Sequence, residues 1–436
     1  MLDLKLAKNI CTLCCICFLQ SNIIFAQEHQ PLPPTDTLRV DLRQTEKMFL
    51  ENNLQLLAQK YSIDSARATI ITAKLFDNPQ FGVSSGLYNP TTSKFFDYSN
   101  GNGEVAMQLS QLIKTAGKRN KNIQLAKTGV ALTEYQFADL LRTLEYTLRN
   151  DFFNIYYLRE TQKVYDVEIG SLQTTNRAYA EQLQKGNVSE LDLIRIQSQQ
   201  YTLQAELATL QNNIDDVESE LKLLLRAKAT IYIVPQYEGA GDNQQVLTEV
   251  PLQSLVDSAY QNRADLKMAK TAVTFNQQNL ALQKALAVPD INIDLGYDRL
   301  GSYVNNYNSI GIDFPLPFFN RNQGNIKQAK IGVQSSQVQL ESTQDAVESQ
   351  IANSYLGAVR AERLLNSFDP RFAGNISHLI GEVTKNFQSH NISLLEFTDF
   401  YDTYKQNVVQ LNNLRYNRVS QLEQLNFTTG TRIFNK

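Results

Sequence analysis

"FPLPFFNRNQGNIKQAK" (314–330) stands out in a chain rich in Gln, Leu, Ala and Lys, because two prolines and three phenylalanines come directly before a polar run. Together with the residues around it, as "IDFPLPFFNRNQGNIKQAKIGV" (312–333), it aligns without a gap on "LSQLIKTAGKRNKNIQLAKTGV" (109–130). In both segments apolar alternation gives way to a pattern with helical spacing. The two segments therefore predict one kind of joint, from strand to helix, that is used twice.

The chain on either side of these segments is also written twice. Residues 40–79 align with 250–289, and "KGNVSELDL" (185–193) aligns with "SHNISLLEF" (389–397). Three blocks recur in one order, so a tandem duplication is the simplest explanation. We expect two structural repeats, at 40–229 and 250–428, with a linker at 230–249 and a C-terminal tail at 429–436.

Each repeat predicts the same succession of elements. At 1.5 Å per residue, the longest predicted helix, of ~68 residues, would be about 100 Å long, which excludes a compact globular core. Pro370 should kink or break this helix in the second repeat. The fold class is therefore mainly helical, with a few strands. The predicted elements are a helix at 42–77 and 251–287, strands at about 79–114 and 289–317, the long helix at 119–185 and 321–388, and a further helix at 190–228 and 394–428.

The predicted strands have one apolar face and one polar face. Ile291, Ile293 and Leu295, for example, alternate with Asn292 and Asp294. Packing on a protein core is the ordinary explanation, but the neighbours here are long amphipathic helices, and lipid can cover the apolar face instead. Open sheet edges cannot lie in hydrocarbon, and the smallest membrane barrels have about eight strands. Four strands per chain therefore predict a barrel that closes only in an oligomer of two, three or more copies.

In such a barrel the polar face lines the interior. Asn292, Asp294 and Asp313 are then predicted to face water, where they would make the lumen weakly favourable to cations. Pro315 and Pro317 withhold two N–H groups from the strand ladder, which suits the end of a strand. In the first repeat Gly117 takes the place of these prolines at the strand-to-helix joint.

The N-terminus predicts a secretory signal peptide at 1–26. Lys5 and Lys8 precede a short apolar stretch, and cleavage is expected after Ala26. A membrane anchor is the alternative, but the apolar run is shorter than the ~20 residues of a spanning helix. All four cysteines lie in this segment, so the mature chain, which begins with a Pro-rich lead-in at 27–39, has no disulfide framework or thiolate metal site.

Charge and residue spacing exclude several function classes. The formal net charge is −3 and the basic residues are scattered along the sequence, so nucleic acid is not an expected partner. The sequence has no phosphate-binding Gly loop, no H-E-x-x-H spacing and no nucleophile-base arrangement, which predicts that the protein is not an enzyme and needs no cofactor. Scattered histidines and the lack of a Met cluster predict no metal site.

The mature chain resembles the TolC-like outer-membrane efflux proteins, and is most like their heavy-metal cation efflux subset. The resemblance rests on "LSQLIKTAGKR", "GNVSELDL", "NRADLKMAK", "PLPFFNRNQGNI" and "HNISLLEF" in this order. It implies a homotrimer in which three times four strands close a 12-stranded barrel in outer-membrane lipid, while the helices form a tunnel through the periplasm. It also implies a passive exit duct, joined through a periplasmic adaptor to an inner-membrane pump, with metal cations as the cargo.

The turns after the long helices carry S-x-x-acid spacing, in Ser189 with Asp192 and in Ser393 with Glu396. Helix capping is a sufficient explanation for this spacing. The resemblance implies that these turns are the periplasmic tips, which makes Asp192, Glu396 and Asp399 candidates for acidic rings that favour cations at the entrance. Candidate adaptor contacts at the same tips are Gly186, Asn187, Ser189, His390, Asn391 and Ser393.

Two other functions fit the same sequence. A duct for drugs, dyes or a secreted polypeptide would share the fold. From a different class, an exported coiled-coil scaffold with a small β cap would bind partners in the cell envelope without conducting anything.

Overall fold

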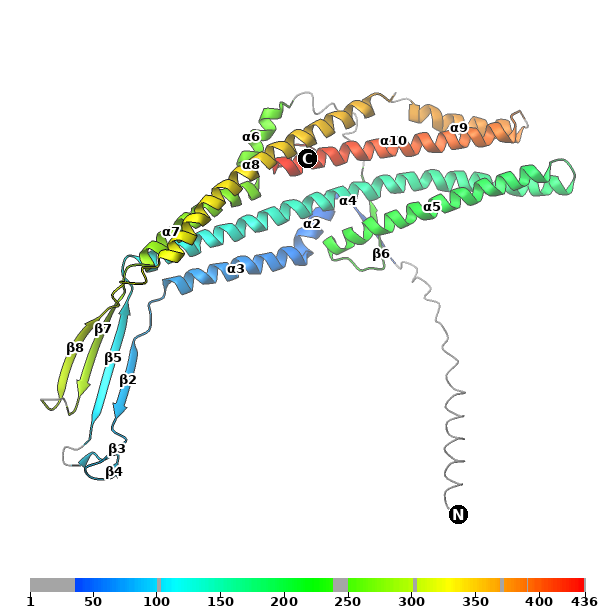
Figure 1. Ribbon diagram of the computed structural model, residues 1–436. Coiled ribbons are helices and arrows are strands. Elements are labelled where there is room, and N and C mark those ends of the chain that lie inside the picture. Colours follow the sequence, from blue (N-terminus) through cyan, green and yellow to red (C-terminus); the bar gives the residue numbers. More distant parts are fainter. Residues whose placement is uncertain are drawn as a thin grey trace, which may run out of the picture.

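A sheet of four strands lies at one end of a long, curved molecule, and two helical hairpins lie at the other (Figure 1). This computed structural model describes residues 36–99, 103–237, 250–300, 304–368, 372–389 and 391–434. The predicted signal peptide, most of the lead-in, part of the linker, Pro370 and His390 lie outside the described residues.

The first repeat contains a helix, α4, of 67 residues, which is about 100 Å long. The other described elements of this half are shorter, and two of them, β1 and β6, were not predicted. In chain order the elements are β1 (Asp36–Val40), α2 (Leu42–Asn52), α3 (Leu54–Lys74), β2 (Gln80–Ser85), β3 (Tyr88–Asn89), β4 (Lys94–Phe95), β5 (Val105–Ile113), α4 (Lys118–Gln184), α5 (Glu190–Leu225) and β6 (Ile231–Pro235).

The second repeat has no counterpart of the continuous helix α4. The helix predicted at 321–388 is interrupted near Pro370, as expected: α8 ends at Asn366 and α9 begins at Phe372. The elements of this half are α6 (Leu252–Asn262), α7 (Ala264–Leu286), β7 (Ile291–Asp298), β8 (Tyr307–Asp313), α8 (Gln323–Asn366), α9 (Phe372–Gln388) and α10 (Leu394–Thr429).

The single helices predicted at 42–77 and 251–287 are wrong, since each is divided by one extended residue. Asn53 separates α2 from α3, and Arg263, which aligns with Asn53 between the repeats, separates α6 from α7. The Asn53 side chain accepts the N–H of Leu56 at 3.0 Å and donates to the carbonyl of Leu224 at 3.0 Å. Asn53 thereby caps α3 and holds the break against another helix.

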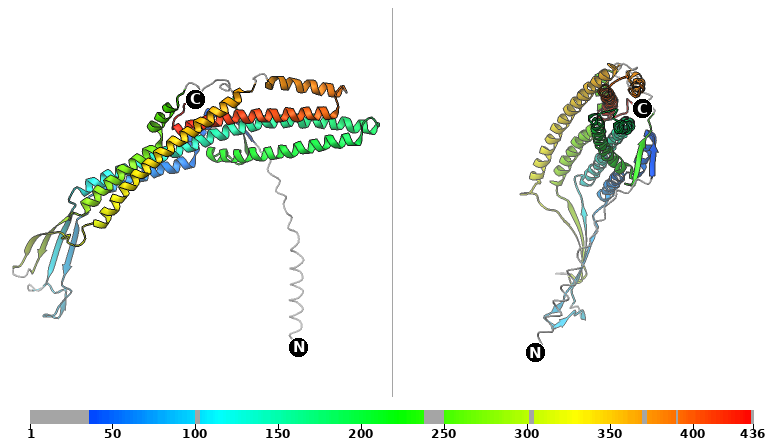
Figure 2. Two further views of the ribbon diagram at one scale, coloured as in Figure 1. Left: turned by 45° about the horizontal axis from the view of Figure 1, so that its top comes forward. Right: turned by 90° about the vertical axis from the view of Figure 1, so that its right-hand side faces the viewer.

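The helices continue the order of the strands. The sheet order is β2-β5-β7-β8, with each neighbouring pair antiparallel. The helices joined to these strands pack as α3 on α4, α4 on α7 and α7 on α8. The right-hand view of Figure 2 shows these four helices side by side as a curved layer, in the same order as the strands. Each chain therefore forms one continuous wall, part sheet and part helix.

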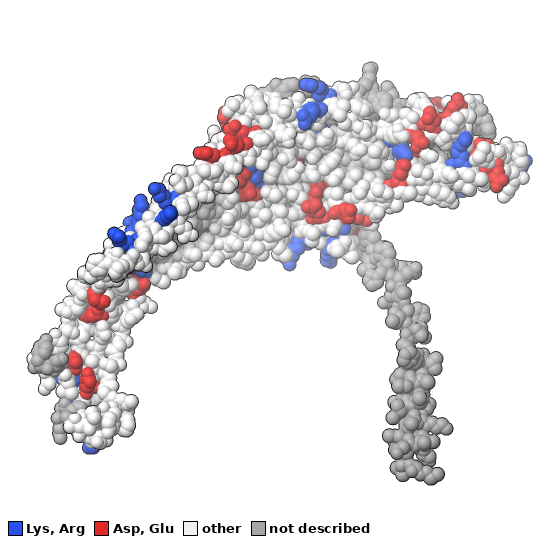
Figure 3. Space-filling view, in the orientation of Figure 1, with Lys and Arg blue, Asp and Glu red and all other residues white. Residues whose placement is uncertain are grey.

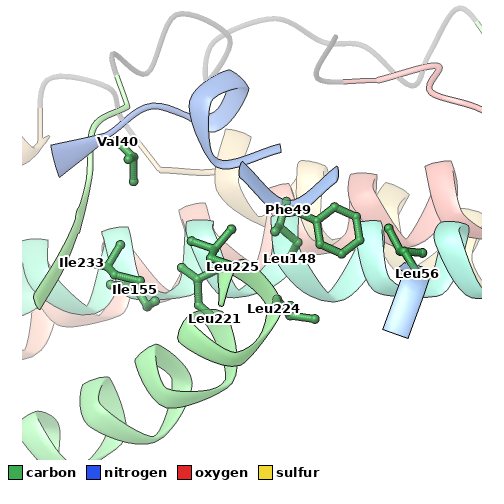
Figure 4. Packing of buried hydrophobic residues seen from close by; sticks show 9 residues of the cluster. All are labelled: Val40, Phe49, Leu56, Leu148, Ile155, Leu221, Leu224, Leu225 and Ile233. Atoms are coloured by element: carbon green, nitrogen blue, oxygen red, sulfur yellow. The ribbon is translucent and has the colours of Figure 1, made fainter. Parts of the chain in front are cut away.

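An apolar cluster near the middle of the molecule packs the N-terminal lead-in and the linker between the repeats against the helices. β1 pairs in parallel with β6, so the N-terminal lead-in and the linker form a two-stranded sheet on the side of the helices. Val40 and Ile233 from these strands pack with Phe49, Leu148 and Leu221 (Figure 4). At 25 cal/mol per Å², each fully buried side chain of this size stabilises the fold by about 1.5–3 kcal/mol.

Candidate functional site

The polar face of the four-stranded sheet gathers the three residues predicted for a barrel interior. Nδ2 of Asn292 donates to the carboxylate of Asp294 at 3.0 Å and lies 3.3 Å from Oδ2 of Asp313 on the neighbouring strand. Two residues of β5 that were not predicted complete this cluster. Ser110 Oγ accepts from Asn292 Nδ2 at 2.7 Å, and Gln108 Nε2 donates to Asp294 Oδ1 at 3.0 Å. The amide groups hold both carboxylates on one face.

The opposite face of this sheet is apolar and uncovered in a single chain. Phe81 in β2, Leu295 in β7 and Ile310 in β8 are 66%, 48% and 73% exposed. β2 and β8 are the edges of the sheet, because each pairs with one other strand of it. Unpaired edges and an exposed apolar face require a cover. Among the described residues, no helix has the length and apolarity that a membrane crossing requires.

The strand-to-helix joints differ between the two repeats. Gly117 has φ 67° and is the N-cap of α4, so the first joint uses a left-handed residue that glycine adopts without strain. In the second repeat β8 ends at Asp313, and a strand that continues to residue 317 is not formed, because Pro315 and Pro317 have no N–H for the ladder. Asn322, with φ 57°, is the N-cap residue of α8.

A buried ion pair ties the two repeats together at the first joint. Nζ of Lys118 lies 2.6 Å from Oδ1 of Asp290, and only 6% of the Lys118 side chain is exposed. The same carboxylate oxygen accepts the N–H of Thr115 at 2.8 Å. Hydrogen bonds from these donors lower the pKa of Asp290 against the opposing effect of burial. This pair joins the start of α4 to the residue before β7, and no sequence motif predicted it.

The first helical hairpin turns at the predicted tip between α4 and α5. Gly186 has φ 73°, and the N–H of Asn187 donates to the carbonyl of Gln182 at 2.9 Å, which closes the end of α4. Ser189 caps α5 through a hydrogen bond from the N–H of Asp192 at 3.1 Å, and its hydroxyl donates to the Asp192 carboxylate at 2.6 Å. The carboxylate of Asp192 thus supports the Ser189 cap and is also a candidate charge at the tip.

The second tip, between α9 and α10, carries a complete capping box. Ser393 Oγ accepts the N–H of Glu396 at 3.2 Å, and Oε2 of Glu396 accepts the N–H of Ser393 at 2.8 Å. The bond from the Ser393 N–H is the main cause that lowers the pKa of Glu396, which keeps this carboxylate ionised. Asp399 lies one turn further along α10 and is exposed. On the other side of the cap, Asn391 donates its N–H to the Asn386 carbonyl at 2.9 Å.

Aromatic packing holds the two hairpins against each other behind these tips. The rings of Phe387 and Phe397 stack at 4.1 Å between centroids, and Tyr179 of α4 stacks on Phe387 at 5.9 Å. Residues of α4, α5, α9 and α10 share one apolar cluster with them, including Leu172 and Ile196. Both tips therefore belong to one packed end of the molecule, the end opposite the sheet in Figure 1.

A polar layer crosses this packed end. Lys405 of α10 forms an ion pair with Glu206 of α5 at 3.0 Å, and Gln199 of α5 donates to Asp402 of α10 at 2.9 Å. We define the polar layer as these four residues with Tyr401, Ser171, Thr384 and Glu168. The Tyr401 hydroxyl lies 2.9 Å from Ser171 Oγ and 2.8 Å from Thr384 Oγ1. The layer connects four helices from both repeats.

Glu168 is the unusual member of the polar layer. It is 0% exposed, and neither carboxylate oxygen has a hydrogen-bond partner among the described residues. Burial raises the pKa of Glu168 to about 8, although the Lys405 ammonium acts in the opposite direction. An unpaired carboxylate in this environment is stable only in its protonated form near neutral pH.

The sequence carries a signal for this layer. Val164, Glu168 and Leu172 are spaced four residues apart and all three are buried, so a charged residue stands in an apolar helix stripe. Phe397, Tyr401 and Lys405 repeat the arrangement on α10. A charge within such a stripe indicates a buried polar contact between helices.

None of these places has the composition of a catalytic centre. The Glu396 carboxylate completes the cap of α10, and the lumen carboxylates accept hydrogen bonds from amides. Within the described ranges, no three His, Cys, Asp or Glu side chains come together as a metal site.

Comparison with known proteins gives consistent matches over most of the chain. A family model described as outer membrane efflux protein matches residues 47–225 and 255–431. The cobalt-zinc-cadmium resistance protein CzcC of Cupriavidus metallidurans is 23% identical over 284 residues, which cover 64% of this chain and 63%, less than two thirds, of that protein. The "Probable outer membrane lipoprotein SilC" of Salmonella typhimurium is 20% identical over 87% of this chain and 83% of that protein.

Solved structures show the same fold at low sequence identity. The CmeC outer membrane channel of Campylobacter jejuni superposes with a TM-score of 0.71 at 16% identity, covering 89% of this chain and 85% of that one. A structure of CusC superposes with a TM-score of 0.70 at 18% identity, covering 91% of this chain and 94% of that one.

Proposed function

Because the chain belongs to the outer membrane efflux protein family, we propose that three copies form one passive duct of a tripartite efflux system. The duct carries substrate from an inner-membrane pump, through a periplasmic adaptor, to the outside. Proteins of this family are efflux channels, so the chain is a conduit and not an enzyme.

The observation that carries this proposal is the unfinished sheet. β2 and β8 leave an open edge on each side, while the apolar face is exposed and the polar face holds Asn292, Asp294 and Asp313. Pairing β8 of one copy with β2 of the next removes both edges at once, and three copies give 12 strands. Lipid then covers the apolar face and water fills the polar interior, as in other membrane barrels.

The helical wall supports a tunnel that continues from the barrel. The helices keep the order of the strands, so an arrangement that closes the sheet also brings α8 of one copy next to α3 of its neighbour. Exposed apolar residues on α3, such as Tyr61 and Ile71, and Val338 on α8 are available for this contact. The same threefold arrangement then buries surfaces in both parts.

We place the entrance of the duct at the two helical tips. Asp192, Glu396 and Asp399 would be repeated three times around the axis, where their charge favours cations. Adaptor contacts would use the exposed turns beside them, at Gly186, Asn187, Ser189, Asn391 and Ser393, and His390, which lies outside the described residues, is the remaining candidate. Capping and an entrance role are compatible, because a capping carboxylate keeps its charge.

Metal cations are the proposed cargo. Support comes from CzcC, whose name describes resistance to cobalt, zinc and cadmium. Carboxylates on the polar face of the sheet and at the tips would give a cation-favouring path at both ends. Export of the chain through the signal peptide at 1–26 is part of the proposal, because the barrel has to reach the outer membrane.

Two experiments test the duct and its cargo separately. An SDS-resistant, heat-modifiable trimer in the outer-membrane fraction is expected, and a monomer in the soluble periplasm would refute the duct. The cargo is then tested by the growth of a deletion strain on zinc, cobalt, cadmium, copper and silver salts, detergents and antibiotics. Sensitivity to metal salts alone is expected, and broad sensitivity to drugs would replace metal by drugs as the cargo.

A further inference from the structure

The segments that join the strands of the sheet to the helices are strongly basic. Four segments form this region, at 74–79, 114–127, 284–290 and 314–330. They contain ten Lys or Arg residues and two carboxylates, in a chain whose formal net charge is −3. The excess of positive charge is therefore local and not a property of the whole protein.

Both carboxylates of these segments are already neutralised. Asp77 pairs with Lys114 at 3.0 Å, and Asp290 pairs with Lys118 at 2.6 Å. Two further cations are engaged by the backbone, since Arg119 donates to the Lys74 carbonyl and Lys121 to the Ala116 carbonyl.

Six cations remain, and we call them the basic collar. All are exposed, and none has a carboxylate partner among the described residues. They lie on α3, α4, α7 and just before or on α8, so the collar crosses the whole width of the wall. The residues are Lys74, Lys127, Lys284, Arg321, Lys327 and Lys330. Figure 3 shows Lys and Arg side chains gathered over the ends of α7 and α8 next to the strands, with acidic residues further along α8.

Large apolar side chains lie directly beside the collar on the side of the sheet. Phe76, Phe318 and Phe319 are 76%, 71% and 93% exposed, and Leu316 is 61% exposed. Aromatic residues at the boundary of an apolar band, followed at once by cations, are the pattern of a membrane interface on the side of anionic headgroups.

We propose that the basic collar binds the anionic headgroups of phospholipids in the leaflet that faces the helices. The inference rests on the proposed function, because it takes the sheet as the membrane-spanning part. The bound lipid would be of the phosphatidylglycerol class, with one phosphate and one net negative charge. The collar would anchor the wall at the strand-to-helix joints.

The positions of the six cations suit this ligand. Lys74 is the last residue of α3, Lys284 is two residues from the end of α7, and Lys330 is seven residues after the start of α8. Lys127, the farthest, is nine residues into α4 and thus about 14 Å from the joint. A headgroup layer of roughly 6 Å and a Debye length of about 8 Å span the same depth.

The test uses the full mature protein in detergent and phosphatidylglycerol as the probe. Bound lipids are counted by native mass spectrometry, with zwitterionic phosphatidylcholine, which has no net charge, as the comparison. The collar variant is Lys284→Gln, Lys327→Gln and Lys330→Gln together. The matched control is Lys60→Gln, Arg360→Gln and Arg363→Gln, which removes three exposed cations from other parts of α3 and α8.

Each Lys near an anionic surface contributes a factor of about five in affinity, so the half-saturating phosphatidylglycerol concentration should rise at least about tenfold in the collar variant. Phosphatidylcholine binding and the control variant should change little, and high salt should weaken phosphatidylglycerol binding by the wild type.

Three results would overturn the proposal. They are an unchanged phosphatidylglycerol affinity in the collar variant, an equal loss in the control variant, and full displacement of the lipid by millimolar inorganic phosphate. Failure of the wild type to form a trimer would instead count against the proposed function, because lipid adducts can be counted on the monomer as well.

Discussion

The ammonium group of Lys405 in α10 lies 3.0 Å from the carboxylate of Glu206 in α5. These residues come from different repeats, and the pair therefore joins the hairpin α9–α10 to the hairpin α4–α5. Lys405 also lies 3.4 Å from Asp402 and faces the buried Glu168. One cation thus compensates two carboxylates, Glu206 and Asp402, at the end of the molecule that carries both tips.

Lys405→Met should loosen the attachment of α10. The methionine fills similar space but leaves the carboxylates of Glu206 and Asp402 without their counter-ion. Glu206 is partly exposed, so we expect a loss of about 1–3 kcal/mol, less than for a fully buried pair. Amide hydrogen exchange in the first half of α10 should accelerate.

The control for this variant is Lys385→Met, which breaks an exposed pair with Glu382 and should cost at most about 1 kcal/mol. Equal effects of the two substitutions would show that Lys405 has no special role.

Glu168→Gln should remove a pH dependence of stability. The pKa of Glu168 is about 8 in the folded protein and 4.5 in the unfolded chain, where the side chain is not buried. Between pH 4.5 and pH 8, folding is therefore coupled to the uptake of a proton. Its contribution to the free energy of unfolding is full below pH 4.5 and is lost as the pH rises through 8, by at most ~1.4 kcal/mol per pH unit. Thermal unfolding of both proteins is measured at pH 5, 6.5 and 8. The melting temperature of the wild type should decrease relative to that of the variant as the pH rises. Parallel curves would contradict the assignment.

Gly117→Ala should destabilise the first strand-to-helix joint. The residue has φ 67°, and an alanine in this conformation costs about 1–2 kcal/mol. Gly324→Ala is the matched control, because this glycine lies in the first turn of α8 and a Cβ there meets nothing within 4 Å. The control should be neutral or stabilising by about 0.5–1 kcal/mol. The melting temperature should therefore fall in Gly117→Ala and stay the same or rise in Gly324→Ala, each relative to the wild type.

Substitutions at the second tip can separate capping from an entrance role. Glu396→Gln with Asp399→Asn removes two charges per chain, while glutamine can still accept the N–H of Ser393 as in other capping boxes. Ser393→Ala removes the cap, at a cost of about 1 kcal/mol, and leaves both charges. In planar bilayers the first variant should lose cation preference and the second should keep it. An equal loss in both would assign these residues to capping alone.

The predicted fold class and family are confirmed, and the reason is the period of the pattern. Alternation over 291–295 and 105–109 corresponds to β7 and β5, and helical spacing after residue 118 corresponds to α4. The matched family model spans both repeats. The helix breaks at Asn53 and Arg263 were missed, because one extended residue hardly disturbs an amphipathic pattern. The parallel pair β1–β6 was missed because its strands are almost 200 residues apart.

By itself, the sequence determined the duplication, the alternation of strands and helices, and the caps of Ser189 and Ser393, since these depend on residues close along the chain. Only the tertiary structure decided which helices lie side by side, that Lys118 meets Asp290 at the joint, and that Glu168 lies buried beside Lys405. Those contacts join residues more than 150 positions apart. Their energies depend on burial and on the distance between charges, neither of which a local pattern contains.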